Sequence, residues 1–331
     1  MKKTAIITGI TGQDGAYLSD LLLKKGYQVI GLTRPDAEEN FLGLNYLGLY
    51  DKVMLKECSL LDLPRIEKIF KEFKPTEVYN LAAQSSVGDS FANPYETINF
   101  NILSVLNLLE AIKKVDKKIH FYQASSSEMY GNVDKLPVTE SSIIHPASPY
   151  AISKVTGHYL AINYREAFDV FACCGILFNH ESYLRGNNFI VKKIIRTALE
   201  IKDGAEKELR VGDIEIRRDF GYAPDYVKAM WLMLQQKQSK DFIICSGESI
   251  SLREIIEYVF DKLRVDKNKI VIDKSFFRPN DIKNIYGDNK KAKKELGWNY
   301  NKTFYDTLDI IIEEEITNRM LNSEKRVLWQ I

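Results

Sequence analysis

The sequence is poor in the residues that bind metal ions or build disulfide frameworks. It has four cysteines and four histidines in 331 residues, and neither type forms a cluster with metal-ligand spacing. There is no CxxC pair, and the adjacent Cys173 and Cys174 cannot bridge each other without strain. We therefore expect buried, reduced thiols in a cytoplasmic protein, and no metal site.

Net charge and long apolar runs are also missing. Lysine and arginine total 46 against 45 acidic residues, so no overall field attracts nucleic acid or an anionic membrane. The apolar run Ala5–Ile10 stops at glycines before it reaches the length of a signal peptide or a membrane span. The lysine-rich run 290–295 resembles a nucleic-acid patch, but six residues of helix that include an acid favour a solvated helix face. We expect neither nucleic acid nor membrane as a partner.

Short apolar runs alternate with helical patterns along the first half of the chain. This alternation predicts βαβ units and an α/β fold with a Rossmann-type, doubly wound parallel sheet. The length exceeds that of one ordinary core, which favours an additional, smaller C-terminal α/β lobe. Strands are predicted over 4–8, 27–32, 53–57, 77–82 and 118–124, and helices over 63–73, 101–114 and 226–236.

A glycine turn lies between the first strand and the first helix. Glycines let the backbone approach a pyrophosphate, and the helix N-terminus offers free N–H groups and a positive dipole end. The pattern alone is weak, but its place after a buried strand makes it a predicted dinucleotide site. The expected cofactor-binding residues of this turn are Gly9, Thr11, Gly12, Gln13, Asp14 and Gly15.

Two further segments bear on the cofactor. After the second strand, where NAD-selective sites commonly have an acid, the chain has Thr33 and Arg34. A guanidinium suits a 2′-phosphate, so we expect NADP rather than NAD. The small residues around Leu81, Ala82 and Ala83 leave room for a cofactor across the strand ends.

Residues 123–131 follow the fifth strand and bring three hydroxyls and a carboxylate into one short run. On its own such a run is more often a serine-rich turn with a solvated acid. Downstream, Tyr150 and Lys154 share a helix face, and a nearby ammonium lowers a phenol pKa. The same spacing recurs at Tyr258/Lys262 and Tyr286/Lys290. Tyr150 is preferred because it starts a helix 24 residues after Ser126.

Several segments together resemble the GDP-mannose 4,6-dehydratase family of extended short-chain dehydrogenases/reductases. The resemblance implies a dinucleotide-binding domain over 1–178, with 212–246 interleaved into it, and a nucleotide-sugar lobe over 179–211 and 247–331. The segments that carry it include Thr8–Gly15, Tyr79–Ser85, Phe121–Gly131, Ser148–Lys154, Gly175–Ser182, Arg218–Phe220 and Phe277–Pro279.

The resemblance also implies roles for individual residues. Tyr150, with Lys154, would take the 4-OH proton while hydride leaves the sugar, and Glu128 with Ser126 would eliminate water across C5 and C6. Arg218 and Arg278 would hold the diphosphate and Asp281 the nucleoside. The remaining residues expected to bind the GDP-sugar substrate are Ser85, Asn179 and Lys193.

Some positions depart from the family pattern. Ser126 stands in place of a common threonine, Cys58-Ser59-Leu60 in place of Gly-Asp-Leu, and Ser86 and Gly88 in place of histidine and lysine. The loop Pro35–Tyr50 has no basic residue. The smaller residues Ser86 and Gly88 would widen the pocket for an N-acetyl group, so GDP-N-acetylglucosamine is an alternative substrate. A 4-keto reductase, a 4-epimerase and a non-catalytic cofactor-sensing regulator are alternative functions, and the resemblance implies a homodimer or homotetramer.

Overall fold

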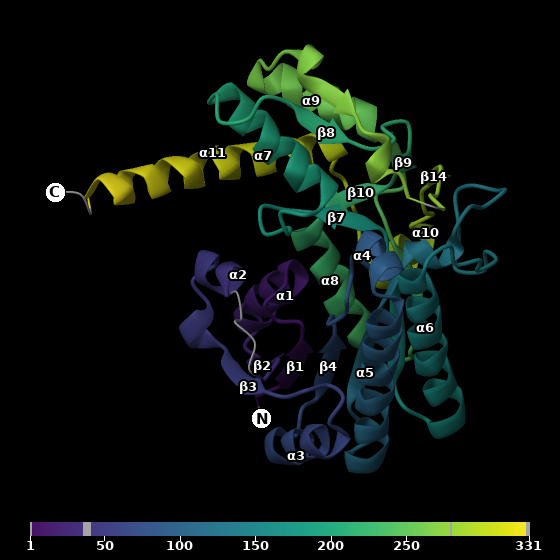
Figure 1. Ribbon diagram of the computed structural model, residues 1–331. Coiled ribbons are helices and arrows are strands. Elements are labelled where there is room, and N and C mark those ends of the chain that lie inside the picture. The colour runs from purple at the N-terminus through teal and green to yellow at the C-terminus, as the bar shows by residue number, and fades with distance from the viewer. Residues whose placement is uncertain (1, 36–40, 279, 329–331) are drawn as a thin grey trace.

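The computed structural model describes residues 2–35, 41–278 and 280–328, with side chains of the last helix described as far as Leu321. Its centre is a sheet of seven strands, all parallel, in the order β3-β2-β1-β4-β5-β6-β11 (Figure 1). The strands are β1 (Thr4–Thr8), β2 (Gln28–Thr33), β3 (Met54–Glu57), β4 (Glu77–Asn80), β5 (His120–Ser126), β6 (Ala172–Leu177) and β11 (Phe242–Ile244). The predicted Rossmann-type sheet is confirmed.

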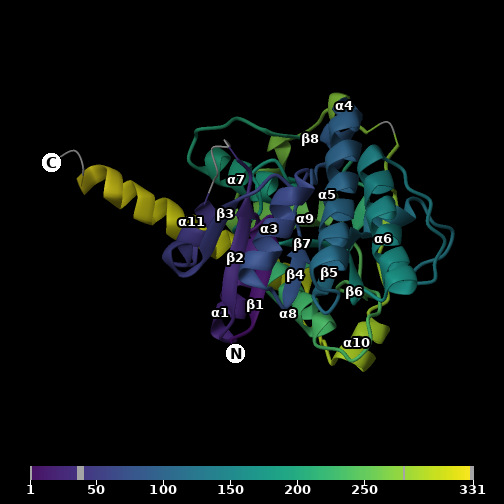
Figure 2. The same ribbon diagram turned by 90° about the horizontal axis from the view of Figure 1, so that it is seen from below.

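Helices cover both faces of this sheet. Ala5 and Ile7 of β1 face one core cluster, which contains residues of α1 (Gln13–Lys24) and α8 (Ala223–Leu234). Ile6 faces the opposite cluster, to which α3 (Leu63–Phe73), α5 (Pro94–Val115) and α6 (Pro149–Phe168) contribute (Figure 2). Burial on both faces explains why the strand reads as a continuous apolar run.

The rest of the chain forms a lobe above the carboxyl ends of the strands (Figure 1). Here β7 pairs with β10, β9 lies between β12 and β14, and β8 pairs with β13. The lobe elements are β7 (Asn179–Glu181), α7 (Ile190–Lys202), β8 (Leu209–Val211), β9 (Arg217–Arg218), β10 (Phe220–Tyr222), β12 (Ile250–Ser251), α9 (Leu252–Leu263), β13 (Ile270–Ile272), β14 (Asn284–Ile285) and α11 (Phe304–Leu328). The short helix α10 (Lys290–Leu296) instead packs beside α8 and β11, in the same core cluster as α1.

Residues 212–246 divide between the two parts. β9 and β10 pair with lobe strands, whereas β11 pairs with β6 of the central sheet. α8 packs in the same core cluster as α1. The chain thus returns to the sheet after entering the lobe, and the proposed domain boundaries stay a prediction.

Two sequence predictions need correction. The helix expected over 101–114 begins earlier, at Pro94. Its first turns escaped prediction because the buried polar residues Thr97, Asn101 and Ser104 interrupt the apolar periodicity there. The segment 35–50, expected as a loop, contains the short helix α2 (Leu42–Tyr46), whose Leu44 is buried. Asp36 and Pro279, which lie in segments discussed above, fall outside the described residues.

Among the described helices, none combines the length and the apolar composition that a membrane span requires. The 25-residue α11 is long enough, but it carries acidic side chains along its length. It extends away from the body of the molecule toward the C-terminus (Figure 1).

Candidate active site

A cavity of about 960 Å³ opens where β1, β2 and β4 end and α1 begins. Asp89 and Arg185 line it together with residues from these strand ends. Every cofactor-binding residue predicted outside the Tyr150/Lys154 pair lines it, namely Gly9, Thr11, Gly12, Gln13, Asp14, Gly15, Arg34, Leu81, Ala82 and Ala83. Ser85, expected to bind substrate, lines this same cavity.

Glycine is required at two positions of this turn. Gly9 has φ +69°, and a Cβ there would lie 2.9 Å from the backbone nitrogen of Ala82. A Cβ on Gly15 would lie 2.3 Å from the carbonyl oxygen of Gly9. The turn therefore packs backbone against backbone at the N-terminus of α1, which leaves N–H groups facing the cavity. Such a cradle fits the pyrophosphate of a dinucleotide.

A buried polar network holds the other rim of the cavity. The Thr8 hydroxyl donates to Asn80 Oδ1 at 2.7 Å, and Asn80 Nδ2 donates to Gln123 Oε1 at 2.9 Å. Thr8 Oγ1 in turn accepts from the backbone N–H groups of Leu81 and Ala82, both at 3.1 Å. The network links three neighbouring strands and fixes the backbone of the small residues predicted to lie under the cofactor.

Asp14 is tied to the lobe by an ion pair. His180 Nε2 lies 2.8 Å from Asp14 Oδ2, and its Nδ1 lies 2.7 Å from the carbonyl oxygen of Phe178. Burial acts to raise the pKa of Asp14, but the facing His180 holds it below its usual value. Burial acts to lower the pKa of His180, yet Asp14 raises it. Gln13 adds a second link, accepting a 2.8 Å hydrogen bond from the Ser182 hydroxyl.

The catalytic candidates come from β5 and from the start of α6. Ser126 ends β5 and caps the 3₁₀ turn η2 (Ser127–Tyr130), accepting from the backbone N–H of Glu128 at 3.2 Å. α6 begins with Pro149 in its first turn, and the Ser148 side chain accepts from Ala151 N at 3.1 Å. Tyr150 thus lies in the first turn of α6.

Burial dominates the ionisation of the Tyr150/Lys154 pair. It raises the pKa of Tyr150 to about 12, even though a hydrogen bond with Ser126 acts to lower it. Burial also lowers the pKa of Lys154 to about 8. Lys154 Nζ donates to the Ala124 carbonyl at 2.9 Å and lies 5.7 Å from the Tyr150 ring centre. The sequence prediction that the ammonium lowers the tyrosine pKa is therefore wrong for the protein alone.

The two other tyrosine–lysine pairs have structural roles. Tyr258 and Lys262 both bind the carboxylate of Asp309, at 2.7 and 2.9 Å. In the third pair, Lys290 donates to Asp288 at 3.0 Å. Both of these lysines bind aspartates, whereas Lys154 donates to the Ala124 carbonyl of β5, so the environment separates the Tyr150/Lys154 pair from the other two.

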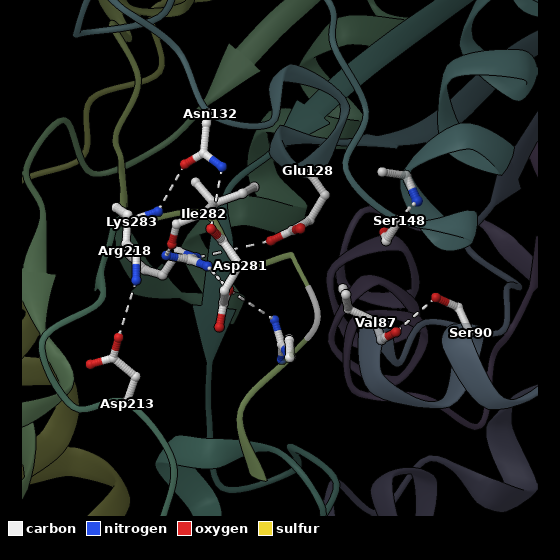
Figure 3. A network of polar contacts seen from close by, with 12 residues as sticks. Val87, Ser90, Glu128, Asn132, Ser148, Asp213, Arg218, Asp281, Ile282 and Lys283 are labelled. Carbon is white, nitrogen blue, oxygen red and sulfur yellow. Dashed lines mark hydrogen bonds and ion pairs between the residues drawn. The ribbon is translucent and has the colours of Figure 1, made fainter. Parts of the chain in front are cut away.

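Residues of the lobe meet Glu128 from the other side (Figure 3). Arg218 Nε lies 4.0 Å from Glu128 Oε1, and Arg218 Nη2 donates to Asp281 Oδ1 at 2.9 Å. Arg278 Nη1 lies 3.7 Å from the same Asp281 oxygen. A second cavity of about 370 Å³ is lined by Asn132, Asp213, Phe277, Arg278, Asn280, Asp281 and Lys283.

The structure places the remaining predicted residues less closely. Lys193 donates to the Arg210 carbonyl at 2.8 Å and lies 4.6 Å from the Phe276 ring centre, beside the loop that carries Arg278. Asn179 starts β7 opposite Phe220. Tyr150 and Lys154 are 9% and 7% exposed and do not line either cavity. In the described part of the chain, no group of three or more His, Cys, Asp or Glu side chains could hold a metal ion.

The sequence profile of the GDP-mannose 4,6 dehydratase family matches residues 6–311. The chain belongs to the GDP-mannose 4,6-dehydratase family. A relative from Arabidopsis thaliana, GDP-mannose 4,6 dehydratase 1, is 42% identical over 326 residues, covering 95% of this chain and 90% of the relative. A relative from Vibrio cholerae, GDP-mannose 4,6-dehydratase, is 39% identical over 351 residues, covering 96% of this chain and 94% of the relative.

Solved structures agree with the Rossmann-type fold of this dehydratase family member. The UDP-glucose 4-epimerase of Thermotoga maritima, solved with UDP-glucose, superposes with a TM-score of 0.85 at 27% identity, covering 95% of this chain and 99% of that chain. RMD from Pseudomonas aeruginosa, complexed with NADPH, superposes with a TM-score of 0.78 at 26% identity, covering 94% and 98%.

Sequence reasoning missed two residues at this candidate site. Arg185 lines the 960 Å³ cavity, and its Nε lies 3.5 Å from the buried Glu181 carboxylate. Asn101 Nδ2 donates to the Gln84 carbonyl at 3.0 Å and to the Ser153 hydroxyl at 2.9 Å, joining the cavity wall to α6. The matching segment Gly175–Ser182 pointed to the region of Arg185, whereas a lone asparagine in a helix gives no signal.

Proposed function

We propose that this protein is a GDP-hexose 4,6-dehydratase that converts GDP-mannose to its 4-keto-6-deoxy derivative. The observation that carries the proposal is the turn after β5. It brings the Glu128 carboxylate and the Ser126 hydroxyl to the end of the sheet, and Tyr150 in the first turn of α6 is the third catalytic candidate. The family relatives named for GDP-mannose support the same substrate class.

A nicotinamide cofactor, when bound in the large cavity, would accept hydride from C4 of the sugar and return it to C6. Tyr150, in the first turn of α6, removes the proton from the 4-hydroxyl. Lys154 contributes a buried cation beside the tyrosine. Loss of hydride and proton leaves a ketone at C4, which acidifies the neighbouring C5 hydrogen.

Glu128 performs the elimination. Its carboxylate takes the C5 proton, the electrons of that C–H bond form the C5=C6 double bond, and the C6–O bond breaks. The departing hydroxyl takes the proton that Glu128 removed, with the Ser126 hydroxyl in place to pass it on, and leaves as water. When hydride returns to C6, C5 takes one proton, which balances the proton that Tyr150 removed from the 4-hydroxyl. A reductase or a 4-epimerase has no elimination step and needs no carboxylate for one. The presence of Glu128 therefore favours the dehydratase over both alternatives.

The GDP portion of the substrate is assigned to the lobe. Arg278 is 38% exposed at the second cavity and supplies a guanidinium suited to a diphosphate, with Arg218 beside it. Asp281 lines the same cavity, where its carboxylate suits the donor edge of guanine. Asn179 and Lys193 are assigned to the same substrate.

GDP-N-acetylglucosamine is the second candidate substrate because of the space at α4 (Val87–Ala92). Ser86 caps this helix by accepting from Asp89 N at 3.2 Å. A Cβ on Gly88 would meet only Ser86 Oγ, at 3.9 Å, so no bulk fills the position where relatives commonly have lysine. An acetamido group needs such room.

We assign NADP rather than NAD on the basis of Arg34, which lines the cofactor cavity next to Thr33. A homodimer through α5 and α6 is the assembly we expect, because these adjacent helices expose Leu103, Ile152 and Tyr159 (Figure 1). A tetramer remains the alternative. The four buried free thiols suit a reducing compartment, which supports a cytoplasmic location.

The test is incubation of the purified protein with GDP-mannose or GDP-N-acetylglucosamine, with NADP and no added reductant. We expect a product lighter by one water from one of them, without net cofactor reduction. Glu128→Gln should abolish this product while substrate binding persists, and Tyr150→Phe should lower turnover by several orders of magnitude. If both sugars stay unchanged, the dehydratase proposal is refuted. Stoichiometric oxidation of added NADPH would indicate the reductase. A Tyr150→Phe variant that functions as well as the unaltered protein would indicate the non-catalytic regulator.

A further inference from the structure

The Arg218 guanidinium is fixed at three points within the lobe. Its Nη1 donates to the carbonyl oxygens of Arg217 and Ile282, at 3.0 and 2.5 Å, and its Nη2 donates to Asp281 at 2.9 Å. Two of these acceptors are backbone atoms, and the side chain is only 6% exposed. A planar group held at three points cannot swing toward a ligand without losing contacts that nothing else in a buried site replaces.

The free edge of this fixed group faces Glu128. Arg218 Nε lies 4.0 Å from Glu128 Oε1, and the Glu128 side chain is 12% exposed (Figure 3). The backbone of Glu128 is itself held by the Ser126 cap. A charge pair at this distance interacts strongly where little water screens it. The guanidinium therefore restricts where the carboxylate of the proposed base can point.

Arg278 differs from Arg218 in its exposure and in how closely its guanidinium is held. Its side chain is 38% exposed, and its nearest acidic partner, Asp281, lies 3.7 Å away. A more exposed guanidinium with a single, longer ion pair is the better group for a ligand that enters and leaves. The two arginines thus divide between an exposed group for the diphosphate and a fixed group beside Glu128.

We propose that Arg218 is a positioning residue that aims the Glu128 carboxylate at C5 of the sugar, beyond any contact it makes with the diphosphate. This role rests on the proposed dehydratase function. It makes the orientation of Glu128, in the turn η2 that follows β5, depend on a residue of β9, 90 residues later in the chain.

The test is Arg218→Lys, which keeps the positive charge but cannot make three planar contacts. With saturating GDP-mannose, or GDP-N-acetylglucosamine if that is the sugar turned over, we expect kcat to fall by about 10- to 100-fold, the usual result of misplacing a reacting group. With sugar deuterated at C5, the isotope effect on kcat should be at least that of the unaltered protein, because proton removal limits turnover. A kcat within twofold, with only KM raised, would show a diphosphate role alone and overturn the proposal.

Arg217→Lys is the matched control. Arg217 is the neighbouring residue of β9, and its guanidinium binds Glu254 Oε2 and the Ser249 carbonyl, both at 2.8 Å, away from Glu128. We expect its kcat to stay within twofold. An equal loss in both variants would mean that damage to β9, and not misplacement of Glu128, lowers turnover, and would overturn the proposal.

A double-mutant cycle keeps the proposal testable if Arg218→Lys also lowers stability. In the Glu128→Asp background the carboxylate is already misplaced, so adding Arg218→Lys should lower kcat less than threefold. A full additional loss would mean that Arg218 acts independently of Glu128. Absence of elimination product from the unaltered protein with both sugars would refute the proposed function and this inference together, whereas product with an additive cycle refutes the inference alone.

Discussion

The buried ammonium of Lys154 makes a quantitative prediction for stability. Burial lowers its pKa from 10.5 to about 8, a difference of about 2.5 units. At 1.36 kcal/mol per unit, holding this lysine charged in the folded protein costs about 3 kcal/mol near neutral pH. Lys154→Met removes that cost. It sacrifices only one hydrogen bond to the Ala124 carbonyl, which also accepts from Gln123 Nε2 at 3.2 Å.

The direction of the pH dependence follows from the protons bound in each state. Between about pH 8 and 10.5 the unfolded chain keeps the Lys154 proton that the folded chain has lost, so the cost of this lysine to folding decreases as pH rises. The stability advantage of Lys154→Met over the unaltered protein should therefore shrink by about 2 kcal/mol between about pH 7.5 and 9.5.

Urea unfolding of the cofactor-free protein at one fixed protein concentration, repeated across this pH range, measures the difference. Lys24→Met serves as the control, because Lys24 is 72% exposed and its substitution should give a curve parallel to that of the unaltered protein. A parallel curve for Lys154→Met would refute the reasoning, since it would mean that Lys154 stays charged in the folded state.

Three other substitutions test separate parts of the structure. Gly15→Ala places a Cβ 2.3 Å from the Gly9 carbonyl, so NADP binding measured by calorimetry should be lost, whereas Gly88→Ala, with its nearest atom at 3.9 Å, should retain it. Ser251→Ala removes the capping box of α9 and should lower the urea-derived free energy of unfolding by about 1 kcal/mol; no change would show that Glu254 alone suffices. Arg165→Lys breaks the paired 2.9 and 2.8 Å contacts with Asp241 that join α6 to the residue preceding β11, and should cost about 1–3 kcal/mol in the same assay, while an unchanged midpoint would contradict the importance of bidentate geometry.

Local patterns in the sequence were enough to predict the sheet and the glycine turn. Strands buried on both faces read as continuous apolar runs, so β1 was predicted over its full length. The turn at Gly9–Gly15 was recognisable because its chemistry is confined to seven consecutive residues. The helix α3 was equally clear, because its apolar positions keep strict helical spacing.

The parts of the site that escaped prediction depend on contacts between distant residues. Asp14 and His180 are separated by 166 residues, and Thr8 meets Asn80 across 72. No spacing rule relates such pairs, since only the folded sheet brings them together. The same holds for Tyr150, whose pKa is set by burial. The sequence shows that Lys154 lies one helical turn from Tyr150, but it does not show that folding removes water from around the phenol.

The two-residue strand β9 links the catalytic turn to the start of helix α9. Arg217 binds Glu254, the residue that completes the cap of α9, while Arg218 reaches Glu128. Fraying of the start of α9 and loosening of the catalytic turn should therefore belong to one local opening reaction. Amide hydrogen exchange at Ser251, Arg218 and Glu128 should then slow and quicken together as conditions change, which would mark the start of α9 and the catalytic turn as one unit of local stability.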